Sequence, residues 1–186
     1  MKKVNHAEAE KRNLKNNSMD YKDFITDVPN WPVEGVLFKD ITPLLSDSEA
    51  FNSVVDDLSI ILSNAPIDFV AGIESRGFIF GAAVSALNGV GFIPVRKEGK
   101  LPPPVESIDS TKEYGNEVLE VKAGKGNIVI VDDVLATGGT LKATEELLVA
   151  AGYTVVGAIV VIDLTYLHDE ILVGGVPVQS LIEYNG

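Results

Sequence analysis

The segment that most constrains the fold spans residues 128–140 and has the sequence IVIVDDVLATGGT. Its four β-branched apolar residues in succession predict a strand buried on both faces, as in a parallel sheet. Asp132 and Asp133 then interrupt the apolar run, small residues follow, and an apolar pattern at helical spacing begins at Leu141. A strand, an acidic pair, a loop and a helix in this order predict an α/β fold with a ligand site where the strand ends.

This segment suits a sugar that carries both hydroxyl groups and a phosphate. Ligands of open parallel sheets bind beyond the carboxyl ends of the strands, where Asp132 and Asp133 can accept hydrogen bonds from sugar hydroxyls. Glycine lets the backbone approach a ligand closely, and the start of a helix offers N–H groups that bind phosphate without a lysine. We therefore expect the phosphate to lie against Ala136, Thr137, Gly138, Gly139 and Thr140.

A turn with no ligand is the simpler interpretation of a Gly-Gly pair, because short motifs often occur by chance. Here thirteen consecutive residues follow the pattern, and they lack the Gly-Lys-Ser/Thr of a P-loop. The segment resembles the motif with which type I phosphoribosyltransferases bind phosphoribosyl diphosphate (PRPP). By this resemblance, the acidic pair holds the ribose hydroxyls and residues 136–140 hold the 5′-phosphate.

The composition indicates one globular domain and argues against several classes of protein. The chain has 186 residues, 46% of them hydrophobic, and no cysteine, so it has neither a disulfide framework nor a thiolate nucleophile. No apolar run is long enough to cross a bilayer, and the basic N-terminal segment is not followed by the apolar stretch of a secretory signal. We therefore expect a soluble, cytoplasmic protein without a membrane partner.

The charge is distributed unevenly along the chain. The net charge is −12, and residues 1–18 hold five Lys or Arg against two Asp or Glu, so the rest of the chain carries −15. Nucleic-acid binding requires a basic surface, and we therefore expect no nucleic-acid partner. Residues 1–18 have almost no large apolar side chains, which predicts a mobile extension in front of a single domain over residues 19–186.

Residues 28–45, VPNWPVEGVLFKDITPLL, combine three prolines and a glycine with large apolar side chains. The prolines exclude a regular helix, so the segment alone predicts a loop packed onto the domain by its aromatic residues. It resembles the N-terminal hood of adenine phosphoribosyltransferases, whose signature is Gly-Val-x-Phe-[Arg/Lys]-Asp-Ile-[Ser/Thr]-Pro. The resemblance implies that Phe38 stacks on the base and that Leu37 and Lys39 contact it through the main chain. Lys39 stands where arginine is common.

The remaining pattern alternates strands and helices, which predicts a parallel sheet covered by helices. A short helix is expected near residues 19–25. A longer one, with an apolar stripe from residue 51 to 62, is expected to have Ser46 or Ser48 as its cap. Another helix is predicted over residues 78–87. The predicted strands are residues 69–73, 91–95, 154–163 and 176–182.

Two further segments carry charge where predicted strands end. GIESRGF at residues 72–78 resembles the diphosphate loop of the adenine enzymes, and VRKEGKLP at residues 95–102 resembles the basic segment that follows it. Without the resemblance, such cations in turns would be ordinary solvated charges. By resemblance, the leaving diphosphate is held by Glu74, Ser75, Arg76, Gly77, Arg96, Lys97 and Lys100. Arg76 would also act in catalysis.

No regular element is predicted between the basic segment and about residue 117, and a loop of this length in a compact domain is usually functional, often as a lid. KEYG at residues 112–115 resembles the Glu-Tyr-Gly segment on the flexible lid of the same family. The resemblance implies that Glu113 is the general acid and base at the purine nitrogens and that Tyr114 helps to close the lid. On its own, Glu113 would be an exposed loop carboxylate.

The four motifs occur in the order of the family and cover the chain from about residue 20 to residue 183. They imply the type I phosphoribosyltransferase fold: a mostly parallel β-sheet flanked by helices, with a small hood and a lid loop. The implied reaction belongs to purine salvage and transfers the 5-phosphoribosyl group of PRPP to N9 of adenine, giving AMP and diphosphate. The resemblance also implies a homodimer and Mg²⁺ held mainly by substrate oxygens and water.

Two alternatives remain open. A phosphoribosyltransferase for hypoxanthine, guanine or xanthine would share the fold, although the hood sequence argues against it. A regulator that senses PRPP and binds DNA or RNA would need a basic surface or an added helix-turn-helix. The acidic body and the short N-terminal segment favour neither of these features.

Overall fold

The computed structural model describes residues 19–62, 66–112 and 115–186. The contacts within the chain divide it into two compact units, Met1–Val54 and Val55–Gly186. The predicted N-terminal extension, residues 1–18, lies outside the described residues. In the described parts of the chain, no helix is both long enough and apolar enough to cross a membrane.

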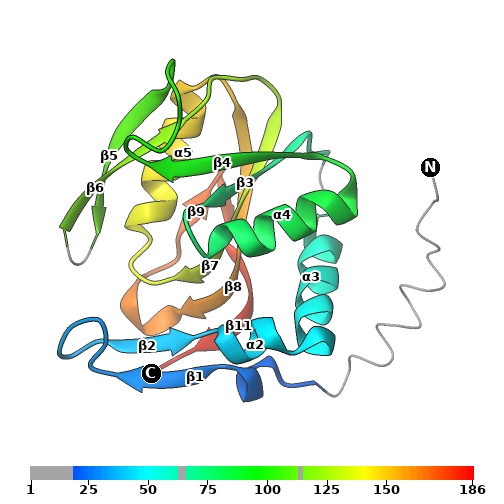
Figure 1. Cartoon of the computed structure of the whole chain (residues 1–186), viewed down its shortest axis with the longest axis vertical. Coiled ribbons are helices and arrows are strands. Elements are labelled where there is room, and N and C mark those ends of the chain that lie inside the picture. The colour runs from blue at the N-terminus through cyan, green and yellow to red at the C-terminus, as the bar shows by residue number, and fades with distance from the viewer. Residues whose placement is uncertain (1–18, 63–65, 113–114) are drawn as a thin grey trace. The chain divides into compact units, whose positions relative to one another are not determined.

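The first unit contains an antiparallel hairpin of two short strands (Figure 1). Its elements are the 3-10 helix Tyr21–Phe24, β1 Thr26–Pro29, β2 Leu37–Asp40 and α2 Thr42–Ser46. The short helix predicted before the hairpin is therefore a 3-10 turn. The exclusion of a regular helix from residues 28–45 was wrong at its C-terminal end. Pro43 lies in the first turn of α2, where a missing N–H group costs nothing.

In the described residues of the second unit, seven strands form one sheet in the order β11-β8-β7-β3-β4-β6-β5. The five strands from β11 to β4 are parallel, and β6 runs antiparallel to both β4 and β5. The strands are β3 Phe69–Ile73, β4 Gly91–Lys97, β5 Glu106–Lys112, β6 Gly115–Val121, β7 Asn127–Leu135, β8 Thr154–Leu164 and β11 Gln179–Tyr184. The predicted mostly parallel α/β sheet is confirmed.

The longer helices lie where the apolar spacing predicted them. They are α3 Ser48–Leu62, which begins in the first unit and ends in the second, α4 Gly77–Asn88 and α5 Gly139–Ala150. The predicted cap of α3 at Ser46 or Ser48 was wrong. Asp47 caps this helix, because its Oδ1 accepts hydrogen bonds from the N–H groups of Glu49 and Ala50 at 3.0 and 2.9 Å.

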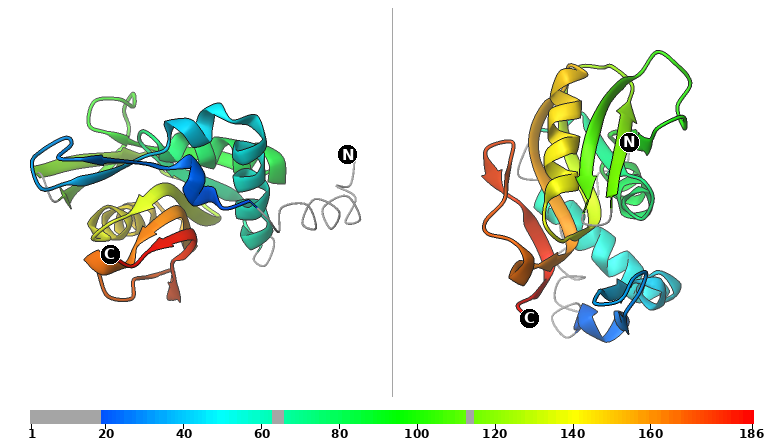
Figure 2. Two further views of the ribbon diagram at one scale, coloured as in Figure 1. Left: turned by 90° about the horizontal axis from the view of Figure 1, so that it is seen from below. Right: turned by 90° about the vertical axis from the view of Figure 1, so that its left-hand side faces the viewer.

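The order in which successive strands are added to the sheet reverses between β3 and β7, although the two strands themselves are parallel. From β3 the chain passes through α4 to β4 on one side, and from β7 it passes through α5 to β8 on the other. Because such crossovers are right-handed, the two opposite directions put α4 and α5 on opposite faces of the sheet (Figure 2). Ligands of open α/β sheets bind at a reversal of this kind, beyond the carboxyl ends of the strands.

The predicted irregular loop before residue 117 was wrong. β5 and β6 form an antiparallel hairpin, with Ser107 opposite Glu120 and Lys112 opposite Gly115. In β5 the polar residues outnumber the apolar ones, so the alternation that would identify a half-buried strand is hidden. The hairpin gains its stability from pairing with the edge of β4, a contact between distant parts of the sequence.

The strand predicted over residues 176–182 is divided in two. Its start belongs to β10, Val176–Pro177, which pairs with β9, Leu172–Val173, in a separate hairpin. Its end belongs to β11, which lies at the edge of the main sheet beside β8. The edge position suggested by Pro177 is confirmed for β11, although the proline itself lies in the small hairpin.

A cluster of buried apolar residues packs α5 against the sheet. Its members include Ile73 of β3, Val95 of β4, Leu119 of β6, Ile130 of β7, Val160 of β8 and Leu147 of α5. Leu141 and Leu148 of α5 and Ala151, which caps its end, join the same cluster, and Thr144 is buried, as the helical spacing predicted. This packing fixes the first turn of α5, and with it the loop between β7 and the helix.

Candidate active site

Two loops leave the sheet at the point where the strand order reverses. Residues 74–76 follow β3 and residues 136–138 follow β7, and α4 and α5 begin directly after them. β3 and β7 are neighbouring strands, with Gly72 opposite Val131, so the two loops lie side by side. The structure therefore brings together the segments that the sequence assigned to diphosphate and to ribose 5-phosphate.

Asp132 lies against the first residue of α4. Its carboxylate is buried, and Oδ1 accepts a hydrogen bond from the N–H of Asp133 at 2.9 Å. A Cβ atom at Gly77 would lie 2.6 Å from the same oxygen, which is closer than real Cβ contacts come. Gly77 therefore leaves room for the acidic pair, in addition to its place in the loop predicted to hold diphosphate.

Burial raises the pKa of both acidic side chains. For Asp132 the negative charge of Asp133 adds to the effect of burial, and its pKa lies well above the usual range. For Asp133 burial also raises the pKa, and the nearby Arg76 guanidinium opposes the rise. Two adjacent buried carboxyl groups are unfavourable when ionised unless donors or cations share their charge. Sugar hydroxyls and a metal ion are partners of this kind.

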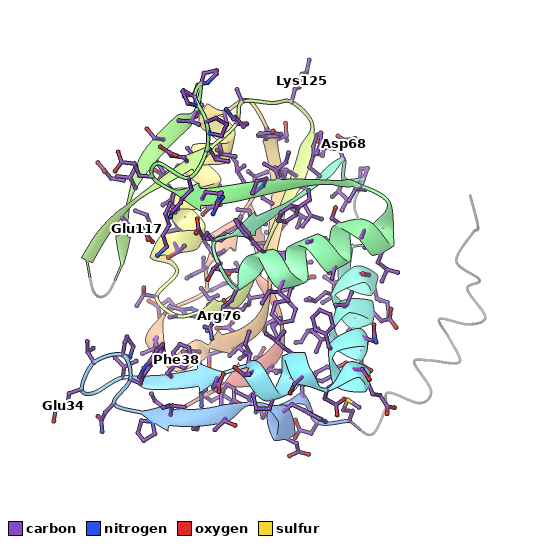
Figure 3. The ribbon with its side chains drawn as sticks, viewed as in Figure 1. Glu34, Phe38, Asp68, Arg76, Glu117 and Lys125 are labelled. Carbon is purple, nitrogen blue, oxygen red and sulfur yellow. The ribbon has the colours of Figure 1, made fainter. Side chains whose placement is uncertain are left out.

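Arg76, labelled in Figure 3, connects the loop after β3 to strand β7. Its Nη2 lies 2.6 Å from Oδ2 of Asp133, and the guanidinium remains partly exposed while the carboxylate is buried. The side chain assigned to diphosphate thus contacts a side chain assigned to the ribose hydroxyls.

The loop before α5 presents main-chain groups. Gly138 has a φ of +82°, a conformation that favours glycine, and a Cβ atom there would collide with the side chain of Ile171. Within the described residues, no side chain caps the start of α5. Thr137 is exposed, and Gly139 and Thr140 form the first turn of the helix. This arrangement suits an anion bound by N–H groups.

Glu74 organises the cations at the end of β4. Its Oε2 lies 3.2 Å from Nε of Arg96 and accepts a hydrogen bond from the N–H of Lys97 at 3.0 Å. Burial raises the pKa of Glu74, but the hydrogen bonds from Arg96 and Lys97 outweigh it, so the pKa lies below its ordinary value. The carboxylate stays ionised and holds Arg96 beside the loop. Ser75 and Lys100 are exposed.

The phosphoribosyl transferase domain family matches residues 45–169 of the chain. The adenine phosphoribosyltransferase of Bdellovibrio bacteriovorus is 45% identical over 166 residues, which is 89% of this chain and 100% of that protein. The chain belongs to the adenine phosphoribosyltransferase family. That membership confirms the predicted fold class and makes the protein a transferase.

Solved structures agree with this membership. The adenine phosphoribosyltransferase of Thermoanaerobacter pseudethanolicus has 41% identity and a TM-score of 0.80, covering 88% of this chain and 98% of that chain. The APRTase of Giardia lamblia, solved in complex with 9-deazaadenine, has 33% identity and a TM-score of 0.81, covering 90% of this chain and 97% of that one.

The hairpin of the first unit carries the residues that the family resemblance assigned to adenine. The Phe38 and Trp31 rings pack in a T-shaped arrangement, with 4.3 Å between the ring centroids, and Leu37 is exposed. Lys39 is buried, and its Nζ lies 2.7 Å from Oδ1 of Asp27 on the opposite strand. The ammonium of this lysine is thus engaged within the hairpin, where many adenine phosphoribosyltransferases have arginine.

The sequence did not identify two acidic residues of β6. Oε1 of Glu117 lies 2.5 Å from Nζ of Lys97, and Oε2 of Glu120 accepts a hydrogen bond from the N–H of Gly99 at 3.1 Å. β6 has the sequence GNEVLEV, in which polar and apolar residues do not alternate, so no local signal in the sequence could have revealed these contacts. Glu113 and Tyr114, the predicted lid residues, lie outside the described residues.

The described site offers positioning and charge rather than a nucleophile. Buried carboxylates, a helix start and several cations surround the ends of three neighbouring strands. Such groups stabilise a leaving group that gains negative charge and a sugar that gains positive charge. This is the chemistry that an adenine phosphoribosyltransferase requires.

Proposed function

We propose that the protein transfers the 5-phosphoribosyl group of PRPP to N9 of adenine and releases AMP and diphosphate, a reaction of purine salvage. The observation that carries the proposal is the contact between Arg76 and Asp133. PRPP carries its diphosphate on C1′, next to the ribose hydroxyls, so it needs an anion-binding group beside a hydroxyl-binding group. The two loops at the reversal of the sheet supply this pair.

Each loop is proposed to bind a different part of PRPP. Asp132 and Asp133 accept hydrogen bonds from the ribose hydroxyls, and the main chain of residues 136–140 holds the 5′-phosphate. The diphosphate is held by the 74–77 loop together with Arg96, Lys97 and Lys100. As N9 forms its bond to C1′, the C1′–oxygen bond breaks and diphosphate leaves with the electron pair. The cations stabilise that charge.

The base is proposed to lie against the segment of residues 28–45, the proposed hood of a single domain over residues 19–186. Phe38 would stack on adenine, and the main chain of Leu37 and Lys39 would contact its edge. Trp31 supports the stacking role, because its ring packs against the Phe38 ring in a T-shaped arrangement. Glu113 would exchange the proton at the purine nitrogens, and Tyr114 would help to close the lid. The proposed location is the cytoplasm.

Mg²⁺ is proposed as the cofactor. Among the described residues, no group of three or more His, Cys, Asp or Glu could hold a metal ion by itself. Mg²⁺ needs few protein ligands when phosphate oxygens and water complete its shell. The carboxylate oxygens of Asp132 and Asp133 fit an ion shared with the substrate, since burial leaves their charge in need of a partner. The ion would add positive charge beside the departing diphosphate.

A homodimer is proposed from α4. This helix contains no charged residue, and Ile79, Ala82, Ala86 and Leu87 are exposed along it. An exposed apolar helix face fits a second copy of the chain related by a two-fold axis. Light scattering of Ile79→Asp should show a monomer where the wild type is a dimer. Val149→Asp, on an exposed apolar residue of α5, should remain dimeric; dissociation of both variants would place the interface elsewhere.

The activity is tested with calorimetry and a base competition assay. PRPP should bind in the presence of Mg²⁺, adenine should bind in its presence, and the protein should form AMP from adenine in a mixture of purine bases. Turnover of guanine or hypoxanthine while adenine stays inert would overturn the choice of base. Salt-sensitive nucleic-acid binding without formation of AMP would favour the PRPP-sensing regulator instead.

A further inference from the structure

Three cations assigned to the diphosphate each contact a carboxylate of the protein. Arg76 contacts Asp133, Arg96 contacts Glu74 and Lys97 contacts Glu117, at 2.6, 3.2 and 2.5 Å. Two of these carboxylates belong to the segments recognised in the sequence. Glu117 does not, and it lies on β6, in the hairpin beyond β4 (Figure 3).

The pairing of β6 with β4 sets the contact between Glu117 and Lys97. Lys97 is opposite Leu119, and Glu117 lies two residues from Leu119, on the same face of the strand. The main-chain N–H of Lys97 is held by Glu74, so the start of its side chain is fixed. Only the ammonium end can change partner. The Lys97 side chain is 46% exposed and that of Glu117 is 19% exposed, so this end of the pair is open to an anion from solution.

We propose that Glu117 is a positioning residue that holds the Lys97 ammonium and gives it up to diphosphate, so that it sets how tightly diphosphate is held. The proposal rests on the function proposed above, in which Lys97 faces diphosphate. Lys97 is the exposed partner of this ion pair and Glu117 is the more buried one, so the ammonium can turn from the carboxylate toward a more highly charged anion. Once diphosphate is bound, the displaced carboxylate repels it at short range. When diphosphate leaves, Glu117 offers the ammonium its former partner.

The test is Glu117→Gln, which keeps the size and polarity of the side chain and removes its charge. We expect diphosphate to inhibit this variant about threefold to tenfold more strongly than the wild type, which corresponds to about 0.7–1.4 kcal/mol. The KM for PRPP should fall in the same direction, and kcat should not rise, because tighter diphosphate leaves more slowly. A residue with a merely structural role would give weaker binding when altered.

Two further variants show whether the effect comes from the exchange of Glu117 for diphosphate as the partner of Lys97, or from a change in the net charge of the site. Glu98→Gln removes the same charge from an exposed neighbour of Lys97 and should leave diphosphate inhibition within twofold of the wild type. In a Lys97→Ala background, Glu117→Gln should have no further effect, because the shared partner is gone. Thermal unfolding of each variant shows whether the fold is intact.

Unchanged or weakened diphosphate inhibition in Glu117→Gln would overturn the proposal, and so would an equal effect of this substitution with and without Lys97. A failure of the proposed function can be told apart from a failure of the role of Glu117. If the proposed function is wrong, the wild type itself will form no AMP and will not bind diphosphate with Mg²⁺. A wild type that forms AMP and is inhibited by diphosphate, beside an unaltered Glu117→Gln, would refute the role of Glu117 alone.

Discussion

The loops after β3 and β7 lie side by side and are both suited to anions, but they are built from different chemistry. The loop after β3 carries charged side chains, Glu74 and Arg76, whose contacts reach the neighbouring strands. The loop after β7 is made of small residues and presents main-chain groups at an α-helix start, with Gly138 at positive φ. The loop after β3 offers an anion charged side chains that can move, and the loop after β7 offers it main-chain groups that are fixed.

The difference matches what each loop is proposed to hold. Diphosphate leaves in every turnover, and side chains such as Arg76 can exchange it for a carboxylate of the protein. The 5′-phosphate stays on the ribose from PRPP to AMP, so a rigid cradle of N–H groups suits it. Substitutions in the loop after β3 should therefore change the affinity for PRPP and diphosphate according to the charge that they add or remove. Substitutions after β7 should act through the backbone.

The largest effect is expected from Gly138→Val. A β-branched residue at φ +82° is strained, and its side chain would also collide with Ile171, so the loop must move. We expect affinity for PRPP and AMP to fall by more than about 100-fold, since a displaced backbone loses the phosphate contacts. Calorimetry with AMP measures this directly.

Gly89→Val is the matched control for that variant. Gly89 caps the end of α4 at φ +68°, and a Cβ atom there would meet nothing within 4 Å. This variant should lose stability by about 1–2 kcal/mol from the same backbone strain and should bind AMP like the wild type. Normal AMP binding by Gly138→Val would contradict the assignment of the phosphate to the loop after β7.

Arg76→Ala is expected to have the next largest effect. The loss of the guanidinium, which pairs with Asp133 and is proposed to hold diphosphate, should lower kcat/KM for PRPP by about 30- to 1,000-fold, equivalent to roughly 2–4 kcal/mol. Arg76→Lys should recover only part of the loss, because an ammonium cannot reproduce the planar guanidinium. Steady-state kinetics with varied PRPP measures both. Equal activity of the lysine variant and the wild type would show that charge alone is needed.

Asp132→Asn should separate stability from binding. Burial and the Asp133 charge raise the pKa of Asp132, so its ionised form destabilises the fold, and stability falls as pH rises from the unfolded pKa through the raised one. The amide removes this penalty, and we expect a gain of about 1 kcal/mol at neutral pH with PRPP affinity lowered about tenfold or more. Urea unfolding at several pH values tests the gain.

Asp133→Asn is the useful contrast to that variant. Its carboxylate contacts Arg76, so the substitution removes a favourable partner together with the buried charge, and little or no stabilisation is expected. If Asp132→Asn were no more stable than the wild type near neutral pH, the charge of Asp132 in the folded wild type would not destabilise the fold.

The backbone-built loop could be predicted from the sequence more completely than the charged one. Four β-branched residues, an acidic pair and small residues before a helical stripe are local signals, and they located β7, the loop and α5. The strand and helix around Arg76 were predicted as well, but its contact with Asp133 joins the loop after β3 to the neighbouring strand β7. No local pattern reports a contact of that kind.

The same limitation explains the errors elsewhere. β5 exists because it pairs with β6, and its polar sequence gives little sign of a strand. Glu117 gains its contact with Lys97 only through the register between β6 and β4. The cap of α3 was missed for a smaller reason, because Asp47 stands between two serines that are equally common caps.

The smallest expected effect is a release of protons when PRPP binds. Hydroxyl donors and a cation favour the ionised form of carboxyl groups whose pKa values burial has raised, so binding should release less than about one proton. PRPP affinity should accordingly rise as pH rises through the raised pKa values. Calorimetry in two buffers with different enthalpies of ionisation measures the release.

Variants of the two loops assign the released protons to their source. Thr137→Ala, in the loop after β7, should release as many as the wild type, because no titrating group changes there. Asp132→Asn should release fewer, and the difference corrects for protons exchanged by the phosphates of PRPP itself. An equal release from Asp132→Asn and the wild type would mean that the acidic pair is already ionised before the sugar arrives, and that Arg76 alone balances its charge.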